Sequence, residues 1–423
     1  MIIHSNFLKP GPNKKMEFFQ HHYLSFDKNG VIDYFGSEYD KIPNSENKSK
    51  KVMTEFIIMP GLIDLHSHIT QFPAIGIGKG GLLEWLDNYI FPLEKKFEQT
   101  EYAYYLSELF FNEAIKYGTT TIVTYSNSSF EGTDAAFEIA KDNGLRVFIG
   151  NSLMDWNLND NFGKSTSENL SITNKLISKW HMFNVQINYI QTPTYALVSS
   201  FELMQKVSEI ATKEDLFIQT HLAENLSEIK KIKDCYPNFD SYTQVYEKSG
   251  VLTDKTLLAH CIQLSDEEIK IIEKNNSSIV HCPSSNNYLR SGFFNIFDKR
   301  KSNIRKSLGS DVAAGTSLSM LNEAKEAINT NKTINILQHG SVEELGADEV
   351  LWMITKGSAE ILHLQDKIGD FMVGMLADFI AINTDKIPMY DLELTPENLC
   401  SRLVYSISNR YVDLTYSRGI RLH

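Results

Sequence analysis

Histidine and aspartate side chains recur in this sequence at one kind of position, the end of a short apolar segment. His66 and His68 end one such segment, and His221, His260 and Asp311 end three others further along the chain. Imidazoles and carboxylates are common metal ligands and common general acids and bases. Their repeated placement at segment ends indicates that the fold gathers them into one chemical site.

The first two histidines have the spacing that two ligands of one metal ion need. On an extended chain the side chains of His66 and His68 point the same way, because side chains alternate with period two. A third imidazole from His221 and a carboxylate from Asp311 would complete a nitrogen-rich site that suits zinc and leaves room for a water molecule. Glu224, three residues after His221, could transfer protons without binding the metal. We therefore expect one Zn²⁺ per chain.

The elements that must position these residues form a regular series. Short apolar segments rich in β-branched residues alternate with longer amphipathic stretches, as in βα units around a parallel sheet. The expected strands are residues 62–66, 119–125, 145–150, 184–190, 215–221, 256–260, 277–281 and 304–311. This series predicts an α/β fold, a (β/α)₈ TIM-type barrel. The carboxyl ends of its strands would meet at one face, where the active sites of such barrels lie.

The two ends of the chain have a different character from its middle. Residues 1–59 contain short β-prone pieces separated by turn formers, and residues 368–382 and 403–412 also have the pattern of short strands. We expect the two ends to form one small β-sandwich domain. The predicted domains are residues 1–59 and 366–423 for the small domain and 60–365 for the metal-dependent hydrolase barrel.

Composition and charge restrict the partners of the protein. The 423 residues include 53 acidic and 41 basic side chains, and a formal net charge of -12 disfavours binding to nucleic acids or to anionic membrane surfaces. The longest apolar run, residues 56–65, is well short of the ~20 residues of a membrane-spanning helix. A signal-peptide pattern is not found at the N-terminus, and the 4 cysteines are widely spaced. We expect a cytoplasmic protein that acts on a small molecule.

The histidine-containing segments resemble those of a known superfamily. Residues 60–68 read PGLIDLHSH, and together with His221, His260 and Asp311 they resemble the amidohydrolase superfamily, whose members with one zinc ion include many deaminases. The resemblance narrows to guanine deaminases. The segments that carry this narrower resemblance are Gln71, 82–86 (LLEWL), 91–92 (FP), 221–225 (HLAEN), 281–286 (HCPSSN) and 291–293 (SGF).

This resemblance implies a reaction and the residues that perform it. The reaction is the zinc-dependent hydrolysis of guanine to xanthine and ammonia. The implied zinc ligands are His66, His68, His221 and Asp311. Asp311 would also accept a proton from the attacking water, Glu224 would transfer protons to the ring and to the departing amine, and His260 would stabilise the tetrahedral species.

The resemblance also implies how the substrate is held. Gln71 would bind the purine edge, and Trp85, Thr194 and Tyr195 would complete the set of substrate contacts. Barrel deaminases are often dimers, so a homodimer is the expected assembly.

One position departs from the guanine deaminase pattern. These enzymes usually have Thr-Pro-Arg-Phe where this chain has Thr192-Pro193-Thr194-Tyr195, and the arginine would hold the purine carbonyl oxygen. A deaminase of another aminated heterocycle, such as a pterin, a triazine or another aminopurine, is therefore the alternative, unless a basic side chain such as Lys79 replaces the arginine. A barrel without a metal that serves as a scaffold is a third hypothesis, which the complete set of ligands disfavours.

Overall fold

The computed structural model describes residues 1–78, 81–158, 163–298, 301, 303–388 and 395–423. The chain divides into two compact units. The first consists of Met1–Asp64, Asn112–Thr121 and Leu318–His423, and the second of Leu65–Phe111 and Ile122–Ser317. The predicted domain bounds at residues 59 and 365 stay a prediction.

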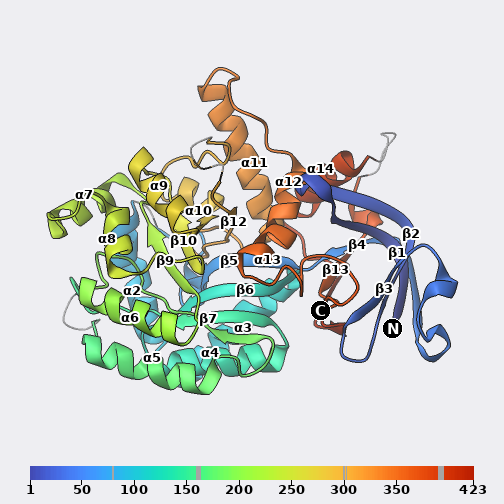
Figure 1. The fold of residues 1–423 in the computed structure, drawn as a ribbon, viewed down its shortest axis with the longest axis horizontal. Coiled ribbons are helices and arrows are strands. Elements are labelled where there is room, and N and C mark those ends of the chain that lie inside the picture. Colours follow the sequence, from blue (N-terminus) through green and yellow to red (C-terminus); the bar gives the residue numbers. More distant parts are fainter. Residues whose placement is uncertain (79–80, 159–162, 299–300, 302, 389–394) are drawn as a thin grey trace. The chain divides into compact units, whose positions relative to one another are not determined.

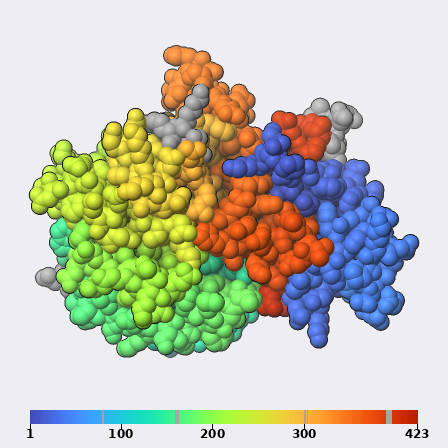
Figure 2. Space-filling view, viewed as in Figure 1, coloured from blue at the N-terminus to red at the C-terminus, as the bar shows by residue number. Residues whose placement is uncertain are grey.

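The first unit contains a seven-stranded sheet with the order β15-β14-β13-β4-β1-β2-β3. Its strands are β1 Ile2–Pro10, β2 Met16–Phe26, β3 Ile32–Gly36, β4 Lys50–Pro60, β13 Phe379–Asn383, β14 Leu414–Ser417 and β15 Ile420–Arg421. Strand β4 pairs parallel with β1 and antiparallel with β13, so strands from both ends of the chain share one sheet. Figures 1 and 2 show the blue N-terminal residues beside the orange and red C-terminal ones.

The first unit differs from the sequence-based prediction in two ways. Its described strands form one sheet, so the expected β-sandwich is not confirmed. Residues 403–412, expected as a strand, lie partly in helix α14 (Pro396–Ile407), where Leu399, Leu403 and Ile407 are buried at a spacing of four residues. That spacing makes one apolar helix face, which the shorter window hid. The other α-helices of this unit are α11 Met320–Leu337, α12 Ala347–Trp352 and α13 Ser358–Ile361.

The predicted barrel strands are confirmed as strands, each within or close to its expected range. They are β5 Leu62–His68, β6 Thr119–Ser126, β7 Arg146–Asn151, β8 Ile187–Tyr189, β9 Ile218–Leu222, β10 Thr256–His260, β11 Ser278–His281 and β12 Lys306–Leu308. They form two four-stranded sheets, with the orders β5-β6-β7-β8 and β12-β11-β10-β9. Strands β9 to β12 run parallel to one another.

Two backbone contacts join these sheets at their outer strands. Gln191, beyond β8, forms a parallel bridge with Ile218 of β9. On the other side the Asp311 N–H donates to the His66 carbonyl oxygen at 2.8 Å. The described strands do not themselves complete a continuous eight-stranded barrel, but these contacts bring the ends of β5 and β12 to the same place.

Helices connect the strands along the chain, and in Figure 1 α4, α5 and α8 lie outside the strands. They are α1 Leu82–Trp85, α2 Phe91–Lys96, α3 Thr100–Lys116, α4 Phe130–Asn143, α5 Thr166–Trp180, α6 Phe201–Lys213, α7 Leu226–Cys235, α8 Tyr242–Ser249, α9 Asp266–Lys274 and α10 Pro283–Tyr288. Ser265 begins α9 through a capping box with Glu268, which confirms the predicted N-cap. Within the described parts of the chain, every helix is too short or too polar to cross a membrane.

Candidate active site

Four of the predicted residues form one tight cluster at the strand ends. His66 and His68 end β5, His221 lies in β9, and Asp311 follows β12. The His68 Nε2 atom lies 3.2 Å from His66 Nε2 and 3.4 Å from His221 Nε2. Asp311 Oδ1 lies 3.2 Å from the Nε2 atoms of both His66 and His68. The sequence-based grouping of these residues therefore corresponds to real proximity.

The chemistry of this cluster fits a divalent cation. His221 Nδ1 donates to the Thr194 carbonyl oxygen at 2.7 Å, so its Nε2 presents a lone pair to the cluster. Ligand atoms of a tetrahedral site with Zn–N distances of ~2.0–2.1 Å lie about 3.3 Å apart. The spacings of 3.2 to 3.4 Å between the imidazole nitrogens agree with that value.

Neighbouring residues fix the orientation of the cluster. The Tyr125 ring stacks on the His68 ring with centroids 4.4 Å apart. Tyr246 donates its hydroxyl proton to the His221 carbonyl oxygen at 2.8 Å. Asp311 has a φ of +48°, a left-handed conformation that is unusual for a residue other than glycine. Such strain is typical of functional sites, where the surrounding structure holds it in place.

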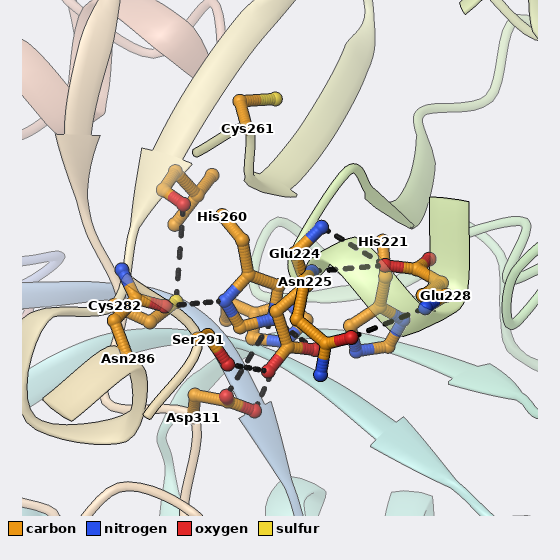
Figure 3. A network of polar contacts seen from close by, with 12 residues as sticks. His221, Glu224, Asn225, Glu228, His260, Cys261, Cys282, Asn286, Ser291 and Asp311 are labelled. Carbon is orange, nitrogen blue, oxygen red and sulfur yellow. Dashed lines mark hydrogen bonds and ion pairs between the residues drawn. The ribbon is translucent and has the colours of Figure 1, made fainter. Parts of the chain in front are cut away.

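Glu224 lies beside the cluster as a buried carboxyl. Its Oε1 accepts a hydrogen bond from the Ser291 hydroxyl at 2.8 Å, and its Oε2 lies 3.6 Å from His260 Nε2 (Figure 3). Its backbone N–H donates to Glu228 Oε2 at 2.9 Å. Burial raises the pKa of Glu224 above its usual value, which favours the protonated form of this carboxyl. Glu224 is therefore suited to donate a proton.

His260, at the end of β10, connects Glu224 to Asp311. Its Nδ1 donates to Asn286 Oδ1 at 2.8 Å, so its Nε2 faces the site, 3.7 Å from Asp311 Oδ2 (Figure 3). Burial by itself lowers the pKa of His260, but the negative charge of Asp311, and of Glu224 once it has given up its proton, outweighs this and raises the pKa. A cationic imidazole at this position can stabilise a negative charge that develops in the site.

The predicted substrate contacts line one cavity together with this centre. Gln71, Trp85, Thr194 and Tyr195 share its wall with His68, His221, Glu224, His260 and Asp311. The Trp85 indole N–H already donates to the Ile77 carbonyl oxygen at 2.9 Å, so this ring offers the cavity mainly apolar surface. Lys79 lies outside the described residues, and the described lining contains neither lysine nor arginine.

Sequence reasoning missed several polar residues of the site. Asn286 orients His260, and Ser291 bonds Glu224; both lie in segments that carry the family resemblance, but neither was given a role. Glu94 and Glu228 also line the cavity. Glu94 follows the Phe91-Pro92 pair, and no local pattern distinguishes it from the charged surface residues of the same helix.

Comparison with known proteins gives a consistent result. Residues 57–421 match the amidohydrolase family. The chain is 33% identical to a guanine deaminase of Rattus norvegicus, over 90% of this chain and 85% of that protein. A solved guanine deaminase from C. acetobutylicum, with guanine bound in its active site, matches with a TM-score of 0.94 and 30% identity, over 100% of this chain and 99% of that one. The predicted resemblance is confirmed: the chain belongs to the amidohydrolase family.

Proposed function

We propose that this protein hydrolyses guanine to xanthine and ammonia. The observation that carries the proposal is one cavity lined by His68, His221 and Asp311 of the cluster, by the Glu224–His260 pair and by the predicted substrate contacts. The extensive similarity to guanine deaminases, one of them with guanine bound, supports the choice of substrate.

We propose zinc as the metal, held by His66, His68, His221 and Asp311. Three imidazoles and one carboxylate are a typical zinc ligand set. A bound zinc ion lowers the pKa of water to ~7 and so supplies a nucleophile at neutral pH.

Side chains of the protein then transfer the protons of the reaction. Asp311 Oδ2 accepts one proton of the attacking water, and Glu224 donates its proton to the ring nitrogen beside the attacked carbon. His260 Nε2 lies 3.6 Å from Glu224 and 3.7 Å from Asp311, where it stabilises the developing negative charge. A tetrahedral carbon that bears a hydroxyl and an amino group results.

Breakdown of this tetrahedral species moves protons through the same two side chains in the reverse sense. The Asp311 carboxyl donates its proton to the amino group, and the C–N bond breaks to release ammonia. Glu224 accepts the hydroxyl proton as the new carbonyl forms. One water is consumed, xanthine and ammonia are released, and both side chains return to their starting protonation states.

A substrate screen tests the proposal. Purified, zinc-loaded protein is incubated with guanine, adenine, pterins and aminotriazines, and ammonia release is measured. We expect the highest kcat/KM with guanine, and about 10²–10⁴-fold slower release by the Glu224→Gln variant. Efficient release from a pterin or triazine, with little from guanine, would overturn the choice of guanine in favour of the alternative that Thr194 raises.

We further propose that the two four-stranded sheets close into one (β/α)₈ barrel, supported by the bridge from Gln191 to Ile218 and the bond from Asp311 to His66. A crystal structure with eight strands in one continuous hydrogen-bonded ring is the expected result. The homodimer remains a prediction, which light scattering of the purified protein checks.

A further inference from the structure

Glu94 is one of four buried carboxyls in the described cavity wall, and the proposed reaction does not use it. It belongs to helix α2 and is 8% exposed. Its Oε1 accepts the Thr70 hydroxyl proton at 2.6 Å, and the Asn127 side-chain amide donates to its backbone carbonyl oxygen at 3.3 Å. Since Thr70 follows β5 and Asn127 follows β6, these bonds tie Glu94 to the ends of both strands.

The other carboxyl oxygen of Glu94 lacks a partner. Its Oε2 is buried and accepts no hydrogen bond from the described residues. Burying such an oxygen without a donor costs free energy, more so when the carboxyl is charged. Burial raises the pKa of Glu94 to about 7, so the charged form is accessible near neutral pH. A ligand in the cavity that offers an N–H group would satisfy this oxygen.

A different buried carboxyl of the same cavity shows what a structural role looks like. Glu228 Oε2 accepts the backbone N–H groups of Glu224 and Asn225 at 2.9 and 3.4 Å. It completes the capping box that begins α7. Helix capping therefore explains Glu228 Oε2, while Glu228 Oε1 is buried without a hydrogen-bond partner among the described residues. Glu94 caps no helix with either oxygen: the bond from Thr70 fixes Oε1 in place, and Oε2 of this cavity-lining residue is left for a ligand to satisfy.

The position of Glu94 in the cavity indicates which part of the substrate it contacts. Glu224, His260 and Asp311 come from the sheet β9–β12 and mark the place of the carbon that loses its amine. Glu94 is bonded to the loops after β5 and β6, and among the described residues it makes no hydrogen bond or ion pair with these three side chains or with His66 and His68. In guanine, the N–H of the five-membered ring lies at the end of the molecule away from that carbon.

We propose that Glu94 Oε2 accepts a hydrogen bond from the five-membered-ring N–H of guanine and so selects the free base over bases substituted at N9. This inference rests on the proposed function. Trp85 and Phe91 line the same cavity with apolar surface, which strengthens a hydrogen bond to a charged carboxyl by excluding water. A nucleoside or an N9-alkyl base lacks the donor and places carbon against a buried oxygen.

The test compares guanine and 9-methylguanine in the parent and in Glu94→Gln. One oxygen of glutamine still accepts the Thr70 proton, but its amide then turns an N–H toward the substrate donor. We expect kcat/KM for guanine to fall about 10- to 150-fold, the range of a hydrogen bond to a charged group, mainly through KM. 9-Methylguanine, which lacks the donor, should change by less than threefold. Where it is turned over too slowly, its inhibition constant replaces KM.

Two controls make each outcome decisive. Glu209→Gln, on the exposed surface of α6, should leave both substrates unchanged. Glu94→Asp keeps the charge but withdraws it by one methylene, and should show the same selective loss; it serves if Glu94→Gln fails to fold. An equal loss for both substrates, or no loss for guanine, would overturn the role of Glu94. A parent protein that releases no ammonia from guanine would instead overturn the proposed function itself.

Discussion

The cavity has two walls that differ in how their polar atoms are satisfied. The reaction wall consists of His68, His221, Glu224, His260 and Asp311, with His66 behind it in the cluster. There each side chain contacts another polar group: imidazole nitrogens lie 3.2 to 3.4 Å apart, Ser291 holds Glu224, and Asn286 holds His260. The recognition wall consists of Gln71, Trp85, Glu94 and Thr194. There Glu94 Oε2 and Thr194 Oγ1 are buried without a partner among the described residues.

This difference separates the roles of the two walls. In the reaction wall, bonds to Ser291, Asn286 and the Thr194 carbonyl oxygen fix Glu224, His260 and His221 before the substrate arrives, so little reorganisation is needed during the reaction. Buried polar atoms without a partner in the recognition wall cost free energy in the empty protein. A ligand that forms hydrogen bonds with them removes this cost, which favours its binding. Changes in the reaction wall should therefore alter kcat and metal content, and changes in the recognition wall should alter KM and substrate choice.

The largest expected effect is removal of the metal. Protein treated with a chelator and freed of it should lose activity to background, and about one equivalent of zinc per chain should restore it. His221→Ala removes one of the four ligands and should retain far less zinc by elemental analysis. His22→Ala, in strand β2 of the first unit, is the matched control. Two metal ions per chain, or full activity without metal, would contradict the single site.

The second effect separates proton transfer from metal binding within the reaction wall. Glu224→Gln should reduce kcat by about 10²–10⁴-fold, the usual contribution of a general acid or base. Zinc content should stay near that of the parent, because the carboxyl bonds Ser291 and is not one of the four clustered ligands. Glu267→Gln, on the exposed start of α9, is the control. More than about half of the parental kcat in Glu224→Gln would contradict the proton-transfer role.

The sequence predicts the residues of the reaction wall better than those of the recognition wall. His66, His68, His221, His260 and Asp311 end short apolar segments, and the strand period places such residues together without knowledge of the loops. The helix at 396–407 was misread because its apolar spacing of four residues needs a longer window than a strand does. Glu94 depends on bonds from Thr70 and Asn127, which lie in two separate loops. Loop packing of that kind leaves no local pattern.

The third effect concerns Thr194 in the recognition wall. Thr194 lines the cavity; its carbonyl oxygen accepts from His221, while its hydroxyl oxygen is buried without a partner among the described residues. The described lining has no lysine or arginine to bind the guanine carbonyl oxygen. Thr194→Arg should therefore raise kcat/KM for guanine by about 10- to 150-fold, the value of one charge-assisted hydrogen bond.

Two further measurements sharpen this expectation. Thr194→Ser keeps the hydroxyl and should leave kcat/KM for guanine within about threefold of the parent. Pterins and aminotriazines, assayed beside guanine, show whether the arginine changes the preferred substrate. A parent with kcat/KM of ~10⁵ M⁻¹s⁻¹ or more for guanine that loses activity on Thr194→Arg would show that this cavity binds the carbonyl oxygen in another way.

The smallest expected effect is on the free energy of unfolding. It tests whether the unpaired carboxyl of Glu94 destabilises the protein when the cavity is empty. Burial, with a smaller contribution from the charge of Glu98, raises the pKa of Glu94 from 4.5 to about 7. Between these values the folded protein binds more protons at Glu94 than the unfolded chain does, so the parent loses stability as pH rises through this window. Glutamine has no charge to bury. The advantage of Glu94→Gln over the parent should therefore grow by about 2 kcal/mol between roughly pH 5.5 and 8.

Thermal unfolding of zinc-loaded parent and variant across this pH range measures that advantage as a difference in Tm. Taking the difference cancels the titration of groups that both proteins share, and Glu267→Gln should show no such trend because its side chain is exposed. Saturating xanthine, which also carries a five-membered-ring N–H, should shrink the advantage at about pH 8, since the ligand then satisfies Glu94 in the parent alone. A Tm difference that is independent of pH would mean that Glu94 is already satisfied in the empty cavity, and the contrast between the two walls would not hold at this residue.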